Sequence, residues 1–342
     1  MKILYGVQTT GNGHICRSRE IIKGLKIRGH DVHVIFSGRA TNLLQEIKIC
    51  KPYITYRGLS FISTRGKIKY LKTAFQLNFI QFYLDILLYD ATGFDLVITD
   101  FEPISARIAK YRSIPSIGIG SQYVFSYNIP ITKGKLFGRF ILKNFAPVDY
   151  PVGLHWHHFD QPILPPIVPD YLKNDRHAIA NKILVYLPFE DKDEIKLVLQ
   201  DINTHHFYIY INSCKHPSDE SNLHYRSFSR RNFLYDLAEC NGVICNAGFE
   251  LPSEALHLGK KILVKPLVGQ MEQESNALAL SQLNLGTTCQ KLNRGLIKDW
   301  LYSPSNPPMN YPDVSKNIVE WIDSGCWNNL TSLAQCVWNK KQ

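Results

Sequence analysis

The first half of the chain alternates short apolar runs with stretches of helical periodicity. Apolar runs typical of buried strands lie at residues 2–7, 31–37, 95–99 and 116–120. Between the first two runs, Ile15, Ile21, Ile22 and Leu25 recur near helical spacing, and Gly29 ends the predicted helix. The repetition of strand, helix and strand favours a parallel, doubly wound α/β sheet over residues 1–150.

A proline-rich stretch separates this half from a second one with the same pattern. Six prolines fall between residues 147 and 169, which predicts an interdomain linker over residues 151–180. Further strands are expected at residues 182–187, 207–212, 242–245 and 261–265. We therefore expect a second Rossmann-like domain over residues 181–313, facing the first across a cleft. The tail, residues 314–342, is expected to be helical, and one option is that it crosses back to the first domain.

The composition is that of a globular protein and excludes a disordered chain. The 342 residues are 45% apolar and 20% charged. The eight cysteines include no C-x-x-C pair, which favours thiols of a reducing compartment over a disulfide or zinc framework. The first six residues are typical of a strand and not of a signal peptide, and no run of about 18 apolar residues predicts a membrane-spanning helix. We expect a cytoplasmic protein, and contact with the inner membrane face stays open.

The positive charge is concentrated in the first half of the chain. Residues 1–150 hold 21 Lys+Arg and 9 Asp+Glu, a net of +12, whereas residues 151–342 hold 18 and 20, a net of −2. A solvated basic surface explains this asymmetry, and so does an anionic partner. The candidate cations for such a partner are Arg17, Lys67, Lys69, Lys72, Lys133, Lys135 and Arg139.

Two polar residues follow strands of the first domain. Gly11 and Gly13 form a glycine turn after the first strand, and His14 stands where the next helix begins. Such a turn lets the backbone approach a ligand, and a neutral histidine there can act as a general base or simply cap the turn. Asp100 ends the strand at residues 95–99 and can orient a histidine or cap a helix. Because His14 and Asp100 are both expected at the same edge of the sheet, we expect their side chains to form a pair.

The segment from residue 246 to residue 277 carries the most specific pattern. A strand ends near Asn246 and Ala247, Gly248 allows close backbone approach, and the following helix directs its N–H groups at the cleft, which suits a diphosphate. Glu254 can accept both hydroxyls of a ribose. Glu272 and Gln273, after the next strand, can bind sugar hydroxyls. The donor-binding candidates are Phe228, Gly248, Phe249, Glu250, Glu254, Gln270, Glu272 and Gln273.

Residues 246–277 resemble the donor-binding segment of glycosyltransferases that have two Rossmann-like domains, the GT-B fold. The match is to enzymes that use nucleotide-diphosphate sugars: the peptidoglycan lipid-linked N-acetylglucosamine transferase, the glucuronosyltransferases and the plant flavonoid glucosyltransferases. The opening GNGH, followed by RSREIIKGLKIRGHDVHVIF, resembles their G-x-G-H and RGH-x-V patterns. The likeness is strongest to an uncharacterised prokaryotic branch, and its specific motifs lie at residues 6–36, 95–103 and 226–286.

The resemblance implies a role for each matched residue. His14 matches the catalytic base and Asp100 its carboxylate partner. Glu254 matches the ribose-binding glutamate, and Glu272 and Gln273 match the pair that holds the donor sugar. Phe228 matches the residue beside the nucleobase. Plant relatives have a histidine where this chain has Asn246, so the diphosphate contact is expected to fall to backbone N–H groups.

The resemblance also implies the stereochemistry. Retaining relatives use two glutamates eight positions apart, and the residue eight before Glu254 is Asn246. A His14 base therefore predicts inversion with no metal and no other cofactor. UDP is the favoured nucleotide. A lipid-linked glycan at the membrane is the favoured acceptor, because the basic stretches also contain Leu77, Phe79 and Ile80. The alternative acceptor is nucleic acid with a modified base. The alternative functions are a sugar-nucleotide 2-epimerase and a non-catalytic binding protein.

Overall fold

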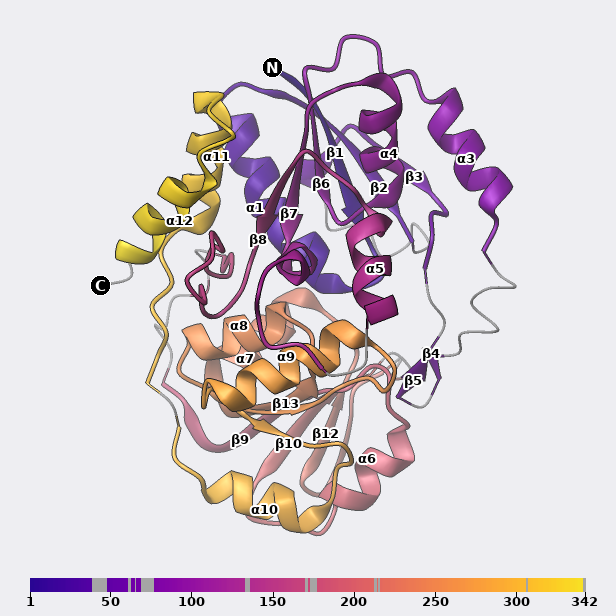
Figure 1. Cartoon of the computed structure of the whole chain (residues 1–342). Coiled ribbons are helices and arrows are strands. Elements are labelled where there is room, and N and C mark those ends of the chain that lie inside the picture. The colour runs from indigo at the N-terminus through magenta and orange to yellow at the C-terminus, as the bar shows by residue number, and fades with distance from the viewer. Residues whose placement is uncertain are drawn as a thin grey trace.

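A computed structural model describes residues 1–38, 48–60, 63–64, 66–68, 77–132, 136–169, 172, 177–211, 214, 216–305 and 307–340. Figure 1 shows two layered α/β units, one above the other, each built around a mainly parallel sheet. The fold predicted from the alternating pattern, two doubly wound domains, is confirmed.

The N-terminal sheet has six parallel strands in the order β3-β2-β1-β6-β7-β8. β1 lies in the middle because its residues are apolar on both faces, and Ile3, Leu4 and Val7 are fully buried. The strands are β1 (Lys2–Gln8), β2 (Asp31–Ser37), β3 (Tyr53–Tyr56), β6 (Leu96–Asp100), β7 (Ser116–Gly120) and β8 (Tyr150–Gly153). The helices are α1 (Asn12–Ile27), α3 (Phe79–Leu88), α4 (Pro103–Arg112) and α5 (Leu136–Phe145), with 3-10 turns η2 (Lys48–Cys50) and η3 (Ser121–Ser126).

The first sheet extends into the segment predicted as a linker. β8 includes Pro151 and pairs with β7, so the strand ends at Gly153 and not at the predicted boundary of residue 150. Proline is compatible with this strand because β8 is an edge strand, where one side of the backbone needs no partner. Sequence periodicity could not show this, since proline density alone is typical of a linker.

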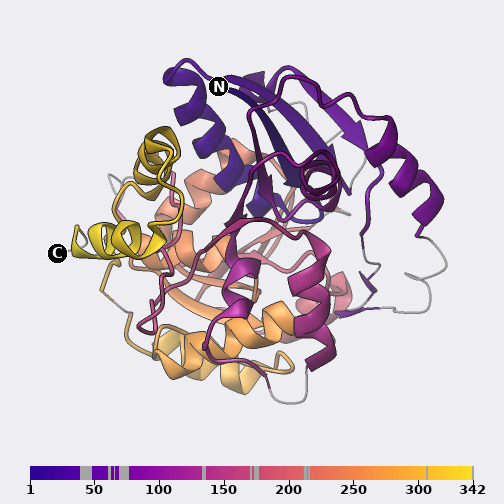
Figure 2. The same ribbon diagram turned by 45° about the horizontal axis from the view of Figure 1, so that its top comes forward.

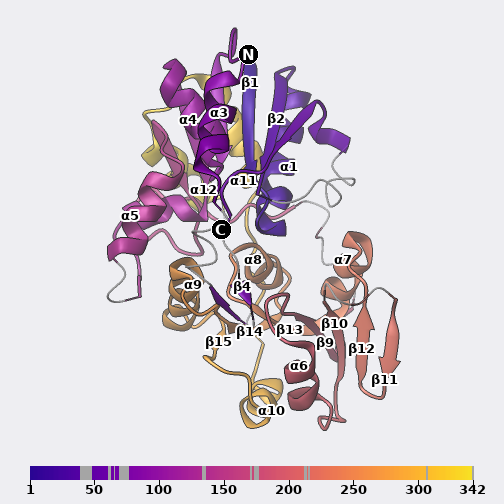
Figure 3. The same cartoon turned by 90° about the vertical axis from the view of Figure 1, so that its right-hand side faces the viewer.

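The C-terminal sheet has seven strands in the order β11-β12-β10-β9-β13-β14-β15, parallel except for the β11–β12 pair. Its strands are β9 (Ile179–Tyr186), β10 (His206–Tyr210), β11 (Ser218–Glu220), β12 (Leu223–Arg226), β13 (Cys240–Asn246), β14 (Lys261–Lys265) and β15 (Thr287–Thr288). Its helices are α6 (Lys192–Leu199), α7 (Arg230–Glu239), α8 (Glu250–His257), α9 (Met271–Gln282) and α10 (Arg294–Tyr302). Figure 3 shows α8 and α9 between this sheet and the N-terminal domain.

The tail forms two helices, α11 (Val314–Ser324) and α12 (Leu330–Asn339), that lie against the N-terminal domain. Figures 1 and 2 both show α11 beside α1. Gly24 of α1 faces Val319 of α11 so closely that an added Cβ would lie 2.9 Å from the Val319 Cγ2 atom. Arg28 also pairs with Glu320 and Asp323 of α11.

A small hairpin of the N-terminal domain reaches the C-terminal domain. Its strands are β4 (Ser63–Thr64) and β5 (Lys67–Ile68), which pair antiparallel. The Gly66 N–H donates to the Phe189 carbonyl (2.7 Å), and the Val268 N–H donates to the Gly66 carbonyl (2.9 Å). These backbone bonds join the two domains beside the ends of β9 and β14.

Candidate active site

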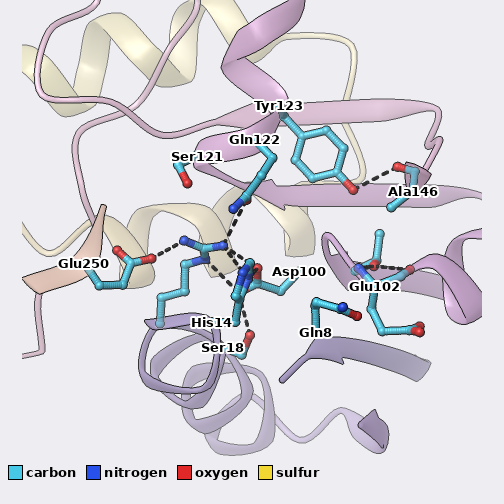
Figure 4. Close-up of polar contacts among 12 residues, drawn as sticks. Gln8, His14, Ser18, Asp100, Glu102, Ser121, Gln122, Tyr123, Ala146 and Glu250 are labelled. Atoms are coloured by element: carbon cyan, nitrogen blue, oxygen red, sulfur yellow. Dashed lines mark hydrogen bonds and ion pairs between the residues drawn. The ribbon is translucent and has the colours of Figure 1, made fainter. Parts of the chain in front are cut away.

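The carboxyl ends of β1 and β6 bring His14 and Asp100 together. The two strands pair in register, with Val7 opposite Asp100, and α1 begins shortly after β1. The His14 Nδ1 lies 2.7 Å from the Asp100 Oδ1. Figure 4 shows the two side chains at the centre of a polar cluster that includes Ser18, Gln122 and Glu250.

Asp100 is fully buried and accepts several hydrogen bonds. Besides His14, the Ser18 Oγ donates to Asp100 Oδ2 (2.8 Å), and the Arg17 Nε donates to the same oxygen (2.7 Å). Burial alone raises the pKa of a carboxyl, but the charge of Arg17, followed by His14, holds the pKa of Asp100 below its ordinary value. Asp100 is therefore an ionised acceptor at neutral pH.

The His14 tautomer follows from these partners. An ionised carboxylate only accepts, so His14 Nδ1 donates its hydrogen to Asp100. The Arg17 Nη2 lies 2.9 Å from the same nitrogen but already has Asp100 Oδ1 and Gln122 Oε1 as acceptors. In the neutral imidazole, this leaves His14 Nε2 without a hydrogen and able to accept a proton. The His14 side chain keeps 13% of its surface exposed, whereas Asp100 has none.

Arg17 does not face solvent, in contrast to its prediction as a cation for an anionic acceptor. Its side chain is 3% exposed and contacts Asp100 on one side and Glu250, from the other domain, on the other. The reason is helical geometry: Arg17 lies three residues after His14 and so shares its inward face of α1. Composition counts such a residue as surface charge, although it is an internal ion-pair partner.

Glu250 is the first residue of α8 and lies against the start of α1. A Cβ added to Gly13 would lie 2.6 Å from the Glu250 Cγ, so only glycine permits this approach. Burial raises the pKa of Glu250 to about 8, although Arg17 acts in the opposite direction. Gly13 thus has a packing role between the domains. At Gly11, the nearest described atom to an added Cβ would be a His14 ring carbon, 3.9 Å away.

The glycine turn before α8 leaves free space. An added Cβ on Gly248 would meet no atom within 4 Å, and the Gly248 N–H donates to the Asn246 carbonyl (2.8 Å). The Asn246 amide donates to the Lys265 carbonyl (3.0 Å) and to Glu190 (3.2 Å), while its own Oδ1 is buried without a partner among the described residues.

The two residues on either side of Gly248 contact other parts of the chain. The Ala247 carbonyl accepts from Asn276 (3.1 Å). Phe249 packs on Trp156, with ring centroids 5.0 Å apart.

Glu254 is buried and pairs with a cation that the sequence interpretation missed. The Arg230 Nη2 donates to Glu254 Oε1 (3.3 Å), and burial raises the pKa of Glu254. Arg230 begins α7, which follows β12. Its spacing from Glu254 carries no local signal, so only the fold brings the two side chains together.

Phe228 belongs to an aromatic group at the same sheet edge. Its ring centroid lies 5.8 Å from that of Phe233 and 6.0 Å from that of Tyr186. Phe228 is 40% exposed. A partly exposed ring supported by the buried Phe233 and the half-buried Tyr186 is a surface on which a planar base can stack.

The candidates at the start of α9 divide into two groups. Glu272 faces the N-terminal domain, where it accepts from Gln122 Nε2 (2.8 Å) and Ser121 Oγ (3.1 Å). Gln273 instead turns inward, because its Oε1 accepts the Leu267 N–H (2.9 Å). The Gln270 Oε1 is buried without a partner.

Four further residues at this interface were missed by the sequence interpretation. Ser121 and Gln122 follow β7, and their signal was available: both come directly after a buried strand that ends at the cleft. Glu190 follows β9, and its carboxylate lies 2.7 Å from the Lys265 Nζ at the end of β14. Lys265 was included in the strand predicted at residues 261–265, but no role was assigned to its side chain.

The remaining basic candidates are only partly described. Lys67 is exposed on β5, whose hairpin with β4 includes Gly66 at positive φ. Lys69, Lys72, Lys133 and Lys135 lie outside the described residues, as does the side chain of Arg139.

Histidines 155 to 158 form a packed group of rings. His155 is buried against Trp156 and Phe159, and burial lowers its pKa to about 3. Within the described ranges, no cluster of three or more His, Cys, Asp or Glu residues could hold a metal ion. None of the helices described in this chain is long and apolar enough to cross a membrane.

Solved structures with the same arrangement are glycosyltransferases. The chain is similar to the glycotransferase of kitacinnamycin, with a TM-score of 0.61 and 12% identity over 98% of both chains. It is similar to SnogD from Streptomyces nogalater, with a TM-score of 0.54 and 13% identity over 98% of this chain and 99% of that one. It is also similar to the spinosyn rhamnosyltransferase SpnG in complex with thymidine diphosphate, with a TM-score of 0.56 and 12% identity over 98% and 96%. A search of curated proteins by sequence found no match.

Two facing Rossmann-like domains make up the GT-B fold. The family model "Glycosyl transferase family 1" matches residues 1–304, and the chain belongs to this family. The resemblance stated from the sequence is confirmed at this level: the protein is a glycosyltransferase.

Proposed function

We propose that this glycosyltransferase moves a sugar, with inversion, from a nucleotide-diphosphate sugar to a hydroxyl group of an acceptor. The observation that carries the proposal is the His14–Asp100 pair at 2.7 Å, with His14 Nε2 left free to accept a proton. UDP is the favoured nucleotide. The open turn at Gly248 and the aromatic surface at Phe228 support a donor in the C-terminal domain.

The proposed reaction is a single displacement. His14 Nε2 takes the proton of the acceptor hydroxyl while its oxygen forms a bond to the anomeric carbon. The bond from that carbon to the diphosphate oxygen breaks, and the diphosphate leaves with the electron pair. Asp100 stabilises the imidazolium that forms, because its carboxylate already accepts from Nδ1. The N-terminus of α8 favours the negative charge on the leaving group, and no metal or cofactor is invoked.

A membrane-borne acceptor, such as a lipid-linked glycan, is favoured by the surface of α3. Ile80 and Leu88 are 77% and 79% exposed, which is unusual for large apolar side chains that lie on one helix. Other exposed apolar residues of α3 are Phe79, Tyr83, Leu84 and Leu87. A helix of this composition can lie in the interface of a bilayer.

Neighbouring helices continue this surface and add positive charge. Arg107 of α4 lies over the Phe82 ring of α3 (5.7 Å) and donates to the Phe145 carbonyl of α5 (3.0 Å), so the three helices are contiguous. Phe140 and Ile141 of α5 are exposed, as are Lys110 and Arg112 of α4. Cations beside an apolar face suit anionic lipid head groups.

A donor and acceptor screen by mass spectrometry tests the proposal. UDP-, GDP- and dTDP-sugars are incubated with lipid extract or with DNA that contains hydroxylated bases. Nucleoside diphosphate released only with lipid acceptor, and a product of inverted anomeric configuration, are expected. Sugar transfer to DNA would instead identify a nucleic-acid acceptor, and an epimeric sugar nucleotide formed without any acceptor would identify an epimerase.

A further inference from the structure

A buried ion pair joins the two domains beside the catalytic edge. The Arg17 guanidinium uses Nε and Nη2 for Asp100 and directs Nη1 to the Glu250 carboxylate of α8. The Arg17 side chain is 3% exposed and that of Glu250 is 11% exposed. One cation therefore connects the acid of the catalytic pair with the helix whose N-terminus borders the open turn at Gly248.

Glu250 lies among groups that attract an anion, although burial outweighs them and raises the pKa of Glu250 to about 8. The starts of α1 and α8 face each other here, as the close approach of Gly13 to Glu250 shows. Neither helix has a side-chain cap at its N-terminus. Two positive helix ends and one guanidinium thus meet around a single carboxylate.

We propose that Arg17 is a donor-diphosphate ligand, and that Glu250 occupies its Nη1 position as an internal competing acceptor, most strongly when ionised, until the diphosphate displaces it. This inference rests on the proposed function, because it assumes a diphosphate donor at the α8 N-terminus. Arg17 can change partners without losing Asp100, since Nε and Nη2 hold Asp100 while Nη1 holds Glu250. A guanidinium also suits phosphate oxygens better than a lysine does, because it donates from a planar fork.

The exchange makes diphosphate binding depend on the charge of Glu250. The groups that face Glu250 are Arg17 and Cys16 of α1, Asp100 of β6 and Glu254 of α8, and Glu254 is itself paired with Arg230. The pKa of Glu250 is about 8, so Glu250 is mainly protonated at pH 7 and mainly ionised at pH 9. An ionised Glu250 holds Arg17 and repels a diphosphate, whereas a protonated one does neither strongly.

Calorimetry with inorganic pyrophosphate tests this exchange without requiring the correct nucleotide or sugar. Glu250→Gln mimics the protonated carboxyl. Its affinity should equal that of the wild type near pH 7 and exceed it about tenfold near pH 9, the factor set by a group with a pKa of about 8. Comparing the proteins at each pH cancels the titration of pyrophosphate itself. Arg17→Lys, which keeps the charge but loses the fork, should weaken binding about tenfold at both pH values.

Matched controls are available on the far end of the same helix. Arg28→Lys and Glu320→Gln alter an Arg–Glu pair of 3.0 Å between α1 and α11 and should leave pyrophosphate affinity unchanged at both pH values. Equal affinities of wild type and Glu250→Gln at pH 9, normal binding by Arg17→Lys, or no pyrophosphate binding by any variant would each overturn the inference. Sugar transfer is measured separately: the expected binding pattern without transfer counts against the proposed function alone, and intact transfer without that pattern counts against this inference alone.

Discussion

At the scale of single residues, Asp100 is the shared hydrogen-bond acceptor at the carboxyl ends of β1 and β6. It accepts from His14, Arg17 and Ser18 while fully buried. A buried carboxylate is stable only when its oxygens are satisfied, and here the partners come from one helix turn of α1. The same arrangement fixes the His14 ring, because the helix that supplies His14 also supplies Arg17 and Ser18.

Replacing His14 should impair chemistry and not donor binding. We expect His14→Ala to lower the turnover number by on the order of 10²–10⁴, because the acceptor hydroxyl loses its general base. Nucleoside diphosphate affinity, measured by calorimetry, should stay within about twofold, since His14 belongs to the acceptor half. Asp100→Asn should lower turnover less. Near-normal turnover of His14→Ala on a verified substrate would show that another group is the base.

Replacing Glu254 should impair donor binding. Glu254→Ala removes a buried carboxylate that can accept ribose hydroxyls, and we expect nucleotide binding to weaken by about 1–3 kcal/mol. Titration calorimetry with the nucleoside diphosphate measures this change. Glu239→Ala is a suitable control, because Glu239 pairs with Lys182 at the amino end of β9, away from the cleft. If Glu254→Ala and Glu239→Ala bind alike, the ribose assignment fails.

At the scale of elements, α3 departs from the usual pattern of an amphipathic helix. Only Phe82 and Ile86 among its ten residues are buried, and Gln81 and Asp85 bond to each other (2.7 Å). A helix that covers a core needs one apolar stripe, whereas α3 is apolar on nearly all sides. The exposed apolar residues are the basis of the proposed contact of α3 with a membrane.

Polar substitutions on α3 should weaken membrane binding. We expect Ile80→Ser with Leu88→Ser to lower binding to anionic liposomes at least about tenfold, because each buried aliphatic side chain contributes about 1.5–3 kcal/mol. Co-sedimentation at about 0.1 M salt measures the effect, with screening over roughly 10 Å. Ile27→Ser is the matched control, since Ile27 is 74% exposed at the end of α1. Equal loss in the control, or no liposome binding by the wild type, would contradict a role for α3.

At the scale of the whole molecule, the tail ties the end of the chain to its first helix. α11 packs on α1, and Asp323 of α11 pairs with both Arg28 and His30. Because α1 supplies His14 and Arg17 at its other end, the tail supports the helix that bears the site. The pyrophosphate controls at Arg28 and Glu320 therefore also test whether loosening this contact reaches the cleft.

A methyl group on Gly24 should destabilise this contact. Alanine is normally the better helix residue, yet an added Cβ at Gly24 would lie 2.9 Å from the stiff Val319 side chain. We expect Gly24→Ala to lower the free energy of unfolding by about 1–3 kcal/mol, measured by urea denaturation. Gly295→Ala, whose nearest contact is 3.5 Å, should be neutral or stabilising. A Gly24→Ala protein as stable as the wild type would mean that α11 shifts freely.

The two α/β domains and the pairing of His14 with Asp100 were predictable from the sequence alone. Both follow from local periodicity: residues that end parallel strands meet at one sheet edge, and β1 and β6 proved to be neighbours. The Gly248 turn was likewise predictable, because it directly follows a buried strand.

Contacts between side chains that lie far apart in the sequence were not predictable and depend on the tertiary structure. Arg17 and Glu250 are separated by 233 positions and Gln122 and Glu272 by 150, and no periodicity relates such residues. Their contacts depend on how two independently patterned domains dock. That packing also buries Arg17, which was predicted as a surface cation, and gives Gln273 Oε1 the Leu267 N–H as a donor. Local sequence fixes which side chains reach a sheet edge, whereas long-range packing fixes which partner each one finds there.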